Sequence, residues 1–449
     1  MADEISNKDG HEIYQFLAEL YPICRSITGH GVRETLQGIA RHVPVKMHEI
    51  PSGTEVFDWI VPQEWNIQDA FIKNKKGERI VDFKQSNLHV VSYSQPIHTT
   101  MTLEELKPHL YSLPENPDWI PYRTSYYKES WGFCLTHRQL MALKDEEYEV
   151  CINSTLESGH LTYGEYVIKG ETEEEILISC HTCHPSLCND NLSGIAVSTF
   201  LAKTLSGRSL RYSYRFLFIP GTIGSIAWLA LHENQVSTII NGMVVTGVGD
   251  PGPLTYKKSR QGNAGIDRAF THILKTSGLE HAIIDFFPYG YDERQYCSPG
   301  FNLPVGCFMR TPHGEYPEYH TSGDNLTFVQ PQPLEESLIC CVRALNILER
   351  NKTFLSQNPK CEPRLGKRGL YRAIGGESEG AKREMAMLWV LNFSDGTHSL
   401  LDIAERSGLE FESIDKAAES LEEHGLLKEV SLVTRPMNSH GGHHGHQGG

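Results

Sequence analysis

The sequence lacks any apolar stretch approaching the roughly 18–20 residues that a helix needs to cross a lipid bilayer. Its first residues, MADEISNKDGHEIYQFL, are acidic and polar, without the basic start and apolar core of a secretory signal peptide. The hydrophobic share of 39% and the charged share of 22% are ordinary for a folded globular protein, so global disorder is not expected. We therefore predict a cytoplasmic protein with no membrane partner.

Positive charge is also in deficit. The chain has 41 Lys and Arg residues against 56 Asp and Glu residues, which gives a formal net charge of −15. Because nucleic-acid phosphates are bound by clustered basic surfaces, no nucleic-acid partner is expected. The 11 cysteines are scattered, and some lie inside apolar runs, as Cys340 and Cys341 do, which is typical of reduced thiols.

Cys180 and Cys183 have the CxxC spacing of redox and zinc-knuckle motifs, but there is no second CxxC to complete a four-thiolate site. A redox motif of the thioredoxin type would also begin a helix, whereas these cysteines close a predicted strand and precede His184. A redox role is therefore disfavoured, and Cys183 is kept as a candidate ligand of a nearby metal ion.

The length of 449 residues predicts two or three domains. A helical start is followed by short alternating strands, and then by buried-type strands that alternate with helices, which indicates an α/β sheet covered on both faces. Near the end, the order helix, short helix, turn, helix and strand predicts a winged helix-turn-helix. The predicted parts are an N-terminal helical part (1–46), an inserted β-rich domain (47–150), an α/β catalytic domain (151–350), the winged helix (365–436) and a disordered His- and Gly-rich tail (437–449).

The segment from His181 to Asp190 is the strongest candidate for a metal site. It follows the buried strand EILISC, and ligands collect at the carboxyl ends of strands in sheets of this kind. The imidazoles of His181 and His184 and the carboxylate of Asp190 are ordinary zinc ligands. A strand-end loop whose histidines only satisfy backbone groups is the alternative, but two histidines with an aspartate favour a metal.

Two later segments could complete this site. His320 comes after the apolar strand VGCFMR, directly follows Tyr319 and is soon followed by Asp324, so it could supply a remote ligand. Taken alone, a loop histidine is the simpler interpretation. The stretch YGYDERQY (289–296) places three charged side chains between tyrosines, for which a solvated turn is the alternative. In the functional interpretation, Glu293 is a general base or ligand and Arg294 anchors a substrate carboxylate.

These motifs carry a family resemblance. The segment from His181 through Asn189–Gly194 (NDNLSG) resembles the metal loop of the M28 zinc aminopeptidases, and Tyr319-His320-Thr321 resembles the late Tyr-His-Thr of that family. Four further motifs, CHPS (183–186), PGTIGS (220–225), YKxS (256–259) and DERQY (292–296), are similar to a bacterial group of aminopeptidase-like proteins of the DUF4910/DUF2172 type. The resemblance implies an M28-like (phosphorylase/hydrolase-like) mixed sheet flanked by helices, with a small inserted β domain and a C-terminal winged helix.

The resemblance also implies a set of ligands. His181 follows the strand directly, as the M28 ligand does, whereas His184 belongs to the motif of the closer group, so either could bind the metal. M28 enzymes carry a Glu-Glu pair where this sequence has Gly221 and Thr222, and one zinc ion is therefore expected rather than two. The candidate ligands are His181, His184, Asp190, His320 and Asp250.

We therefore predict a zinc-dependent hydrolase of the aminopeptidase type that cleaves a peptide or amide bond, and the group implies a role in polysaccharide or natural-product biosynthesis. A non-hydrolytic metal- or ligand-binding protein on the same scaffold is the alternative. The presumed recognition helix of the winged helix, residues 411–424, is acidic and would pack on another domain or a sister subunit, which favours a homo-oligomer. The predicted catalytic residues are Glu293, Arg294 and Tyr319, and the predicted substrate-binding residues are Asp292, Tyr296 and Asn189.

Overall fold

The structure, a computed structural model, describes residues 7–370 and 378–430. The chain divides into two units, Met1–Glu349 and Arg350–Gly449. The predicted tail at 437–449 lies outside the described residues, as do residues 371–377 and 431–436 of the predicted winged helix. Within the described residues, every helix is too short or too polar to span a membrane.

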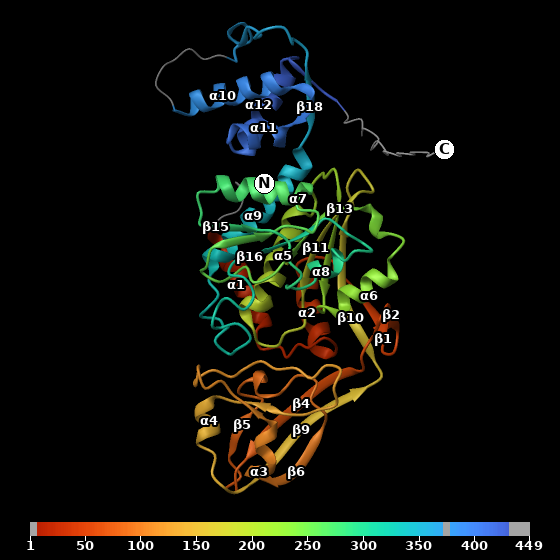
Figure 1. Cartoon of the computed structure of the whole chain (residues 1–449), viewed down its shortest axis with the longest axis vertical. Coiled ribbons are helices and arrows are strands. Elements are labelled where there is room, and N and C mark those ends of the chain that lie inside the picture. Colours follow the sequence, from red (N-terminus) through yellow and green to blue (C-terminus); the bar gives the residue numbers. More distant parts are fainter. Residues whose placement is uncertain (1–6, 371–377, 431–449) are drawn as a thin grey trace, which may run out of the picture. The chain divides into compact units, whose positions relative to one another are not determined.

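The first unit is built on an eight-stranded mixed sheet (Figure 1). Its four neighbouring strands β12, β11, β13 and β16 run parallel to one another, so their carboxyl ends meet at one edge. Antiparallel strands extend the sheet on both sides. In spatial order the strands are β1 (Lys46–Pro51), β10 (His160–Ile168), β12 (Ser213–Ile219), β11 (Glu175–His181), β13 (Ile239–Val245), β16 (Val305–Met309), β14 (Leu254–Lys257) and β15 (His281–Ile284).

Both faces of this sheet are buried. Leu177 of β11 packs in one core cluster with Trp228 and Tyr296, which belong to two helices on that face. Since successive strand residues point to opposite sides, Ile176 and Ile178 are buried on the other face. The helices of this unit are α1 (Asn7–Leu20), α2 (His30–Ala40), α5 (Gly194–Leu205), α6 (Ile223–Leu231), α7 (Gly265–Thr276), α8 (Glu293–Tyr296) and α9 (Pro331–Arg350).

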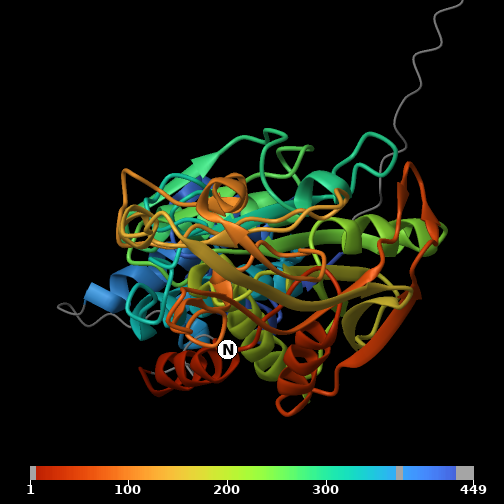
Figure 2. The ribbon, with the colours of Figure 1, turned by 90° about the horizontal axis from the view of Figure 1, so that it is seen from below.

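A β-rich insertion precedes the central strands and is drawn in orange in Figure 1; Figure 2, seen from below, turns it toward the viewer. Its antiparallel sheet has the order β5-β4-β9-β6, and alternate residues of β9 are buried, which gives the sheet one packed face. Because β1 pairs with β10 in the large sheet, the insertion begins after Pro51. Its elements are β2 (Glu55–Val56), β3 (Trp59–Ile60), β4 (Glu64–Lys73), β5 (Arg79–Asp82), β6 (Ile97–Thr102), α3 (Leu103–Leu106), β7 (Leu110–Tyr111), β8 (Phe133–Cys134), α4 (His137–Met141) and β9 (Glu147–Glu157).

The second unit combines helices with a three-stranded antiparallel sheet of order β18-β17-β19. Its helix α11 begins at a capping box, in which the hydroxyl of Ser399 accepts from the backbone N of Asp402 and the carboxylate of Asp402 accepts in return from the backbone N of Ser399. This is the arrangement of a winged helix-turn-helix. The elements are β17 (Thr353–Ser356), α10 (Ser378–Phe393), β18 (Asp395–Ser399), α11 (Leu400–Ser407), α12 (Phe411–Glu423) and β19 (Leu427–Glu429).

Candidate metal centre

The carboxylate of Asp190 lies among three histidines at the carboxyl edge of the parallel strands. Strand β11 ends at His181, and the chain returns toward it through a segment in which Asp190 has the non-helical angles φ −109° and ψ 85°. Oδ1 of Asp190 lies 2.7 Å from Nε2 of His181. Oδ2 lies 2.9 Å from Nε2 of His320 and 3.4 Å from Nε2 of His184. The structure thus brings together the two sequence segments that were predicted to share a site.

The residues of this cluster fit a zinc ion. The donor atoms of His181, His184 and Asp190 all lie within 4.8 Å of one another, and the three side chains are buried. Imidazole nitrogens and a carboxylate oxygen are the donors that zinc takes in proteins. His320 is 34% exposed and forms the open side of the cluster.

The electrostatics of the cluster also suit a cation. Burial lowers the pKa of His181 to about 4, although its hydrogen bond with Asp190 acts in the opposite direction. Burial opposes ionisation of Asp190, yet the charge of His184 and the hydrogen bond from His181 hold the pKa of that carboxyl well below its usual value. Burial also acts against a charge on His184, yet Cys183 and Asp190 hold the pKa of that imidazole well above its usual value. A metal ion bound here would therefore take the place of the proton on His184, while His181 is already neutral.

Hydrogen bonds from outside the cluster hold the ligand loop. The carboxylate of Asp324 accepts from the backbone N of Asn189 at 2.6 Å and from that of Asp190 at 2.9 Å. On the other side, Nε of the buried Arg25 donates to the backbone O of His184 at 2.8 Å. Both contacts fix ligand backbone, which is the part of a metal site that second-layer groups usually orient.

The insertion helps to hold His320 in an unfavourable conformation. His320 has a φ of 54°, in the left-handed region that a residue other than glycine adopts at a cost. Its backbone O accepts from the backbone N of Tyr122 at 2.8 Å, and the backbone N of Ile120 donates to Oγ of Ser322 at 2.9 Å. The ring of Tyr319 stacks on that of His320 with centroids 3.9 Å apart. The strained ligand is therefore held from both sides.

Two tyrosines that the sequence did not single out contact the ligands. Oη of Tyr122 lies 3.2 Å from Nδ1 of His184. Oη of Tyr291 lies 3.4 Å from Nε2 of the same histidine and 3.1 Å from Sγ of Cys183, and its ring stacks on His181 at 3.7 Å. Tyr122 opens the aromatic run YRTSYYKESWGF, which is the only signal in the sequence that could have drawn attention to it.

A further histidine, His313, lies near Tyr319 and Tyr291, the two tyrosines whose rings stack on His320 and His181. Its ring centroid is 5.9 Å from that of Tyr319 and 6.3 Å from that of Tyr291. Nε2 of His313 is buried and has no hydrogen-bond partner among the described residues. Burial lowers the pKa of His313, which favours the neutral form of its imidazole.

Asn189, a predicted substrate-binding residue, and Asp250, a predicted ligand, are hydrogen-bonded to each other. Nδ2 of Asn189 donates to Oδ2 of Asp250 at 3.0 Å, and Oδ1 of Asn189 accepts from the backbone N of Asp250 at 3.1 Å. The carboxylate of Asp250 also accepts from Oγ1 of Thr311 at 2.6 Å. Both side chains are buried, and Asp250 is not among the clustered donor atoms. They tie the metal loop to the end of β13.

Tyr296 and Asp292 also lie in the interior, although they were predicted to bind substrate. Tyr296 is fully buried, with Oη 2.9 Å from Oγ of Ser179 beneath the sheet. Asp292 is buried as well, and Oδ1 accepts from Oγ of Ser225 at 2.7 Å. Burial raises the pKa of Asp292 to about 7. Tyr296 belongs to α8 and Asp292 directly precedes it, so the packing of this helix buries both side chains.

Glu293 is buried in an ion pair. Oε1 lies 2.5 Å from Nζ of Lys257, and Oε2 accepts from the backbone N of Tyr291 at 2.9 Å. With both oxygens engaged, Glu293 fixes the position of Tyr291, and this placement does not favour the predicted role as general base. Its neighbour Arg294 is exposed at the mouth of a cavity.

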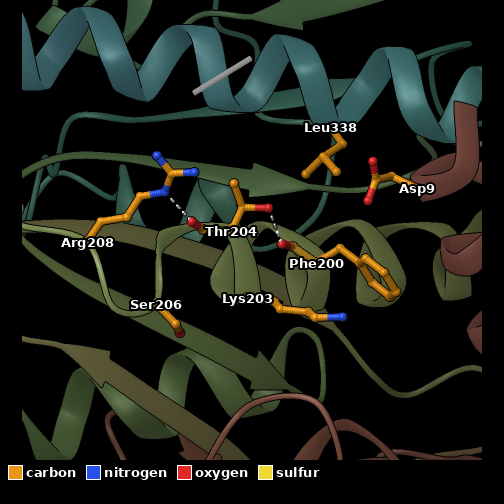
Figure 3. A pocket seen from close by; sticks show the side chains of 7 residues that line it. All are labelled: Asp9, Phe200, Lys203, Thr204, Ser206, Arg208 and Leu338. Atoms are coloured by element: carbon orange, nitrogen blue, oxygen red, sulfur yellow. Dashed lines mark hydrogen bonds between the residues drawn. The ribbon is translucent and has the colours of Figure 1, made fainter. Parts of the chain in front are cut away.

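That cavity, of about 310 Å³, opens beside the cluster and is bordered by Gly221, Tyr291 and Arg294. A larger hollow of about 530 Å³ lies against α1, α5 and α9 (Figure 3). Polar groups of this hollow are hydrogen-bonded to one another. Figure 3 shows one such bond, in which Nε of Arg208 donates to the backbone O of Thr204 at 2.6 Å. None of the predicted site residues lines the larger hollow. The smaller cavity is therefore the candidate for substrate.

Comparisons with known proteins agree with this architecture. Residues 14–351 match the model of a family described as a domain of unknown function, DUF4910, and residues 352–429 match that of a winged helix-turn-helix. A Clostridium acetobutylicum protein, provisionally named a polysaccharide biosynthesis protein with an aminopeptidase-like domain, is 55% identical over 425 residues, covering 95% of this chain and 98% of that protein.

Two solved structures are similar to this chain. One, provisionally named a peptidase and also from C. acetobutylicum, is 54% identical with a TM-score of 0.90, covering 94% of this chain and 97% of that one. A zinc aminopeptidase from Bacillus subtilis has a TM-score of 0.55 at 13% identity, covering 76% of this chain and 94% of that one, and it shares the fold alone. The predicted mixed sheet flanked by helices and the C-terminal winged helix are confirmed.

Proposed function

Since the chain belongs to the DUF4910 family, whose name assigns no activity, we propose one from its own residues: a zinc-dependent hydrolase that cleaves a peptide or amide bond. The observation that carries this proposal is the buried carboxylate of Asp190 in contact with the Nε2 atoms of His181, His184 and His320. The aminopeptidase-like name of the 55% identical relative supports the same reaction type. That name also supports a role in polysaccharide biosynthesis.

The space around Gly221 supports one zinc ion rather than two. A Cβ added at Gly221 would come within 1.9 Å of Cε1 of Tyr291, so the ring of Tyr291 fills the place of a side chain at position 221. A carboxylate from this strand end, which a second ion would need, has no room there. We propose that a single ion is held by Asp190 and His320 together with one or both of His181 and His184.

Each group in and around the cluster would perform a different part of the reaction. Zinc at this position would polarise the scissile carbonyl and lower the pKa of a water molecule to about 7. His313, whose buried Nε2 has no hydrogen-bond partner among the described residues, would take the proton of the attacking water and return it to the leaving amine. The hydroxyl of Tyr319, next to His320, would stabilise the developing oxyanion. Tyr122 and Tyr291 orient His184, and Glu293 holds Tyr291 in place.

Metal content and hydrolysis test this proposal together. Purified protein should contain about one zinc per chain by elemental analysis and should hydrolyse members of a panel of dipeptides and acyl amides. His320→Ala should lose both properties, whereas His424→Ala, an exposed histidine of the second unit, should keep them. Both variants retain the terminal histidine cluster, and repeating the analysis on a chain ending at Pro436 removes its contribution.

Unchanged zinc and unchanged hydrolysis in His320→Ala would overturn the proposal. Zinc bound through His320 without turnover of any panel member would instead support the alternative, a non-hydrolytic protein on the same scaffold.

A further inference from the structure

The cavity of about 310 Å³ shares Tyr291 with the surroundings of the metal cluster. The ring of Tyr291 stacks on His181 at 3.7 Å and also borders the cavity. The backbone O of Gly221, another bordering residue, accepts from Sγ of Cys183 at 3.6 Å. The cavity and the cluster are therefore neighbours, with Tyr291 as their common wall.

Much of the cavity wall is apolar and comes from distant parts of the chain. Ile27 follows the first helix, Ile223 and Ile226 belong to α6, and the insertion contributes aromatic residues; the loop before α8 and the start of that helix complete the wall. Two of these aromatic residues, Trp59 and Tyr127, are 45% and 57% exposed, with ring centroids 5.5 Å apart. Large aromatic side chains left open to solvent beside a concave site are typical of a surface that binds an apolar ligand group.

The charge of the cavity is positive. Arg294 is the one charged residue that lines it, and Arg294 forms no ion pair or hydrogen bond with any residue that the structure describes. The exposed guanidinium therefore gives the cavity a charge opposite to the net charge of −15 of the chain. No carboxylate lines the cavity, so it offers no counter-charge to the ammonium of a free amino terminus.

From these features we propose that the cavity selects an amide whose bulky apolar part carries a free carboxylate, such as an N-acylated aromatic or branched amino acid or the end of a peptide bearing one. The apolar group packs against Trp59 and Ile226, and Arg294 binds the carboxylate. This inference names the substrate class of the proposed hydrolase and so rests on the proposed function. In the reaction, water adds to the carbonyl, the C–N bond breaks, and a carboxylic acid and an amine are released.

Calorimetric titration of the full-length zinc-loaded His313→Gln variant, which should keep zinc but turn over the probes only slowly, tests the cavity separately from turnover; each further substitution is made in this background. The probes are N-acetyl-L-phenylalanine, its uncharged carboxamide, L-phenylalaninamide with a free amine, and N-acetylglycine. N-acetyl-L-phenylalanine should bind about tenfold or more tightly than each of the other three, because a charge-assisted hydrogen bond and a buried ring each contribute at that level. Arg294→Gln should abolish the preference over the carboxamide, and Trp59→Ala should reduce the preference over N-acetylglycine.

Arg260→Gln is the matched control, since it removes one exposed positive charge that does not line the cavity, and it should leave all preferences unchanged. Equal binding of the acid and the carboxamide, or tighter binding of the free amine, would overturn the proposal. The two proposals fail differently. Hydrolysis without carboxylate preference rejects this cavity assignment alone, whereas carboxylate-selective binding without hydrolysis rejects the enzymatic activity and leaves the binding site in place.

Discussion

The hydroxyl of Tyr122 lies 3.2 Å from Nδ1 of His184, although 62 positions separate these residues in the chain. Tyr122 comes from the β-rich insertion, and His184 from the loop after the central strand. The ring of Tyr122 also lies against His320 with a centroid distance of 5.2 Å. The insertion is therefore a wall of the candidate metal centre, in contact with two of its histidines.

Removal of this hydroxyl should weaken metal binding. In Tyr122→Phe, Nδ1 of His184 loses a partner that sets the orientation and tautomer of the ring, so zinc affinity should fall by roughly 10-fold or more. Competition with a chromophoric chelator measures this affinity. Tyr127→Phe removes an exposed hydroxyl from the same aromatic run and should have no effect. Equal affinities of Tyr122→Phe and the native protein would show that Tyr122 does not orient His184.

The buried pair of Lys257 and Glu293 should contribute mainly to stability and to the position of Tyr291. Either Lys257→Met or Glu293→Gln leaves one member uncompensated, and breaking a buried pair in this way costs roughly 3–5 kcal/mol of unfolding free energy. Urea denaturation measures that cost. Turnover separates the two roles of Glu293: a positioning role predicts similar losses in both variants, whereas a general base predicts a much larger loss in Glu293→Gln.

The pH dependence of the unfolding free energy should show that Asp292 is protonated in the folded chain. Burial raises the pKa of this carboxyl from 3.8 to about 7 in the folded chain. Between these two pKa values the folded chain keeps the proton of Asp292, whereas the unfolded chain loses it. The stabilising contribution of protonated Asp292 is therefore fully present below about pH 4 and is lost as the pH rises through about 7. Asp292→Asn should remove a slope of at most about 1.4 kcal/mol per pH unit in this window. Urea unfolding at several pH values, with a chelator present throughout, measures the slope.

A matched control for this experiment is Asp285→Asn, which removes a carboxylate that is 90% exposed. Its pH profile should follow that of the native protein. If Asp292→Asn also retained the native slope, Asp292 would be ionised in the folded chain, contrary to its buried position.

Gly221 should tolerate no side chain while Tyr291 is present. In Gly221→Ala the new Cβ meets the ring of Tyr291. Such overpacking typically lowers the unfolding free energy by about 1–3 kcal/mol. Thermal unfolding should show the loss, and zinc affinity should fall because the ring is displaced from His181. The double variant Gly221→Ala/Tyr291→Leu should recover part of the stability. Failure of the smaller side chain to restore any of it would mean that the cost arises elsewhere.

His313 should act as a general base and should not bind the metal. In His313→Gln, turnover should fall by roughly 10²–10⁴-fold, the usual contribution of a general base, while the zinc content stays at the native value. His281→Gln, on β15, is the control. Loss of zinc in His313→Gln would identify His313 as a ligand instead, and native turnover would remove it from the mechanism.

Much of the fold and the centre of the site follow from the sequence alone. The consecutive apolar residues Ile176, Leu177 and Ile178 in EILISC predict a strand covered on both sides, because neighbouring strand residues point to opposite faces, and β11 is buried throughout. His181 and Asp190 could be paired because the strand end and the helix start are close in sequence. His320 could be joined to them because parallel strands end at the same edge.

The tertiary structure alone decided which neighbours of these residues are structural and which face the site. Asn189, Asp292, Glu293 and Tyr296 all have polar groups suited to substrate, yet each is buried and contacts another side chain of the interior. Tyr122 and Tyr291 are ordinary aromatic residues in the sequence, and they reach His184 only because the insertion and the loop before α8 fold over the same strand end. Sequence patterns report the period and burial of an element, whereas contacts between distant loops depend on packing that no local pattern encodes.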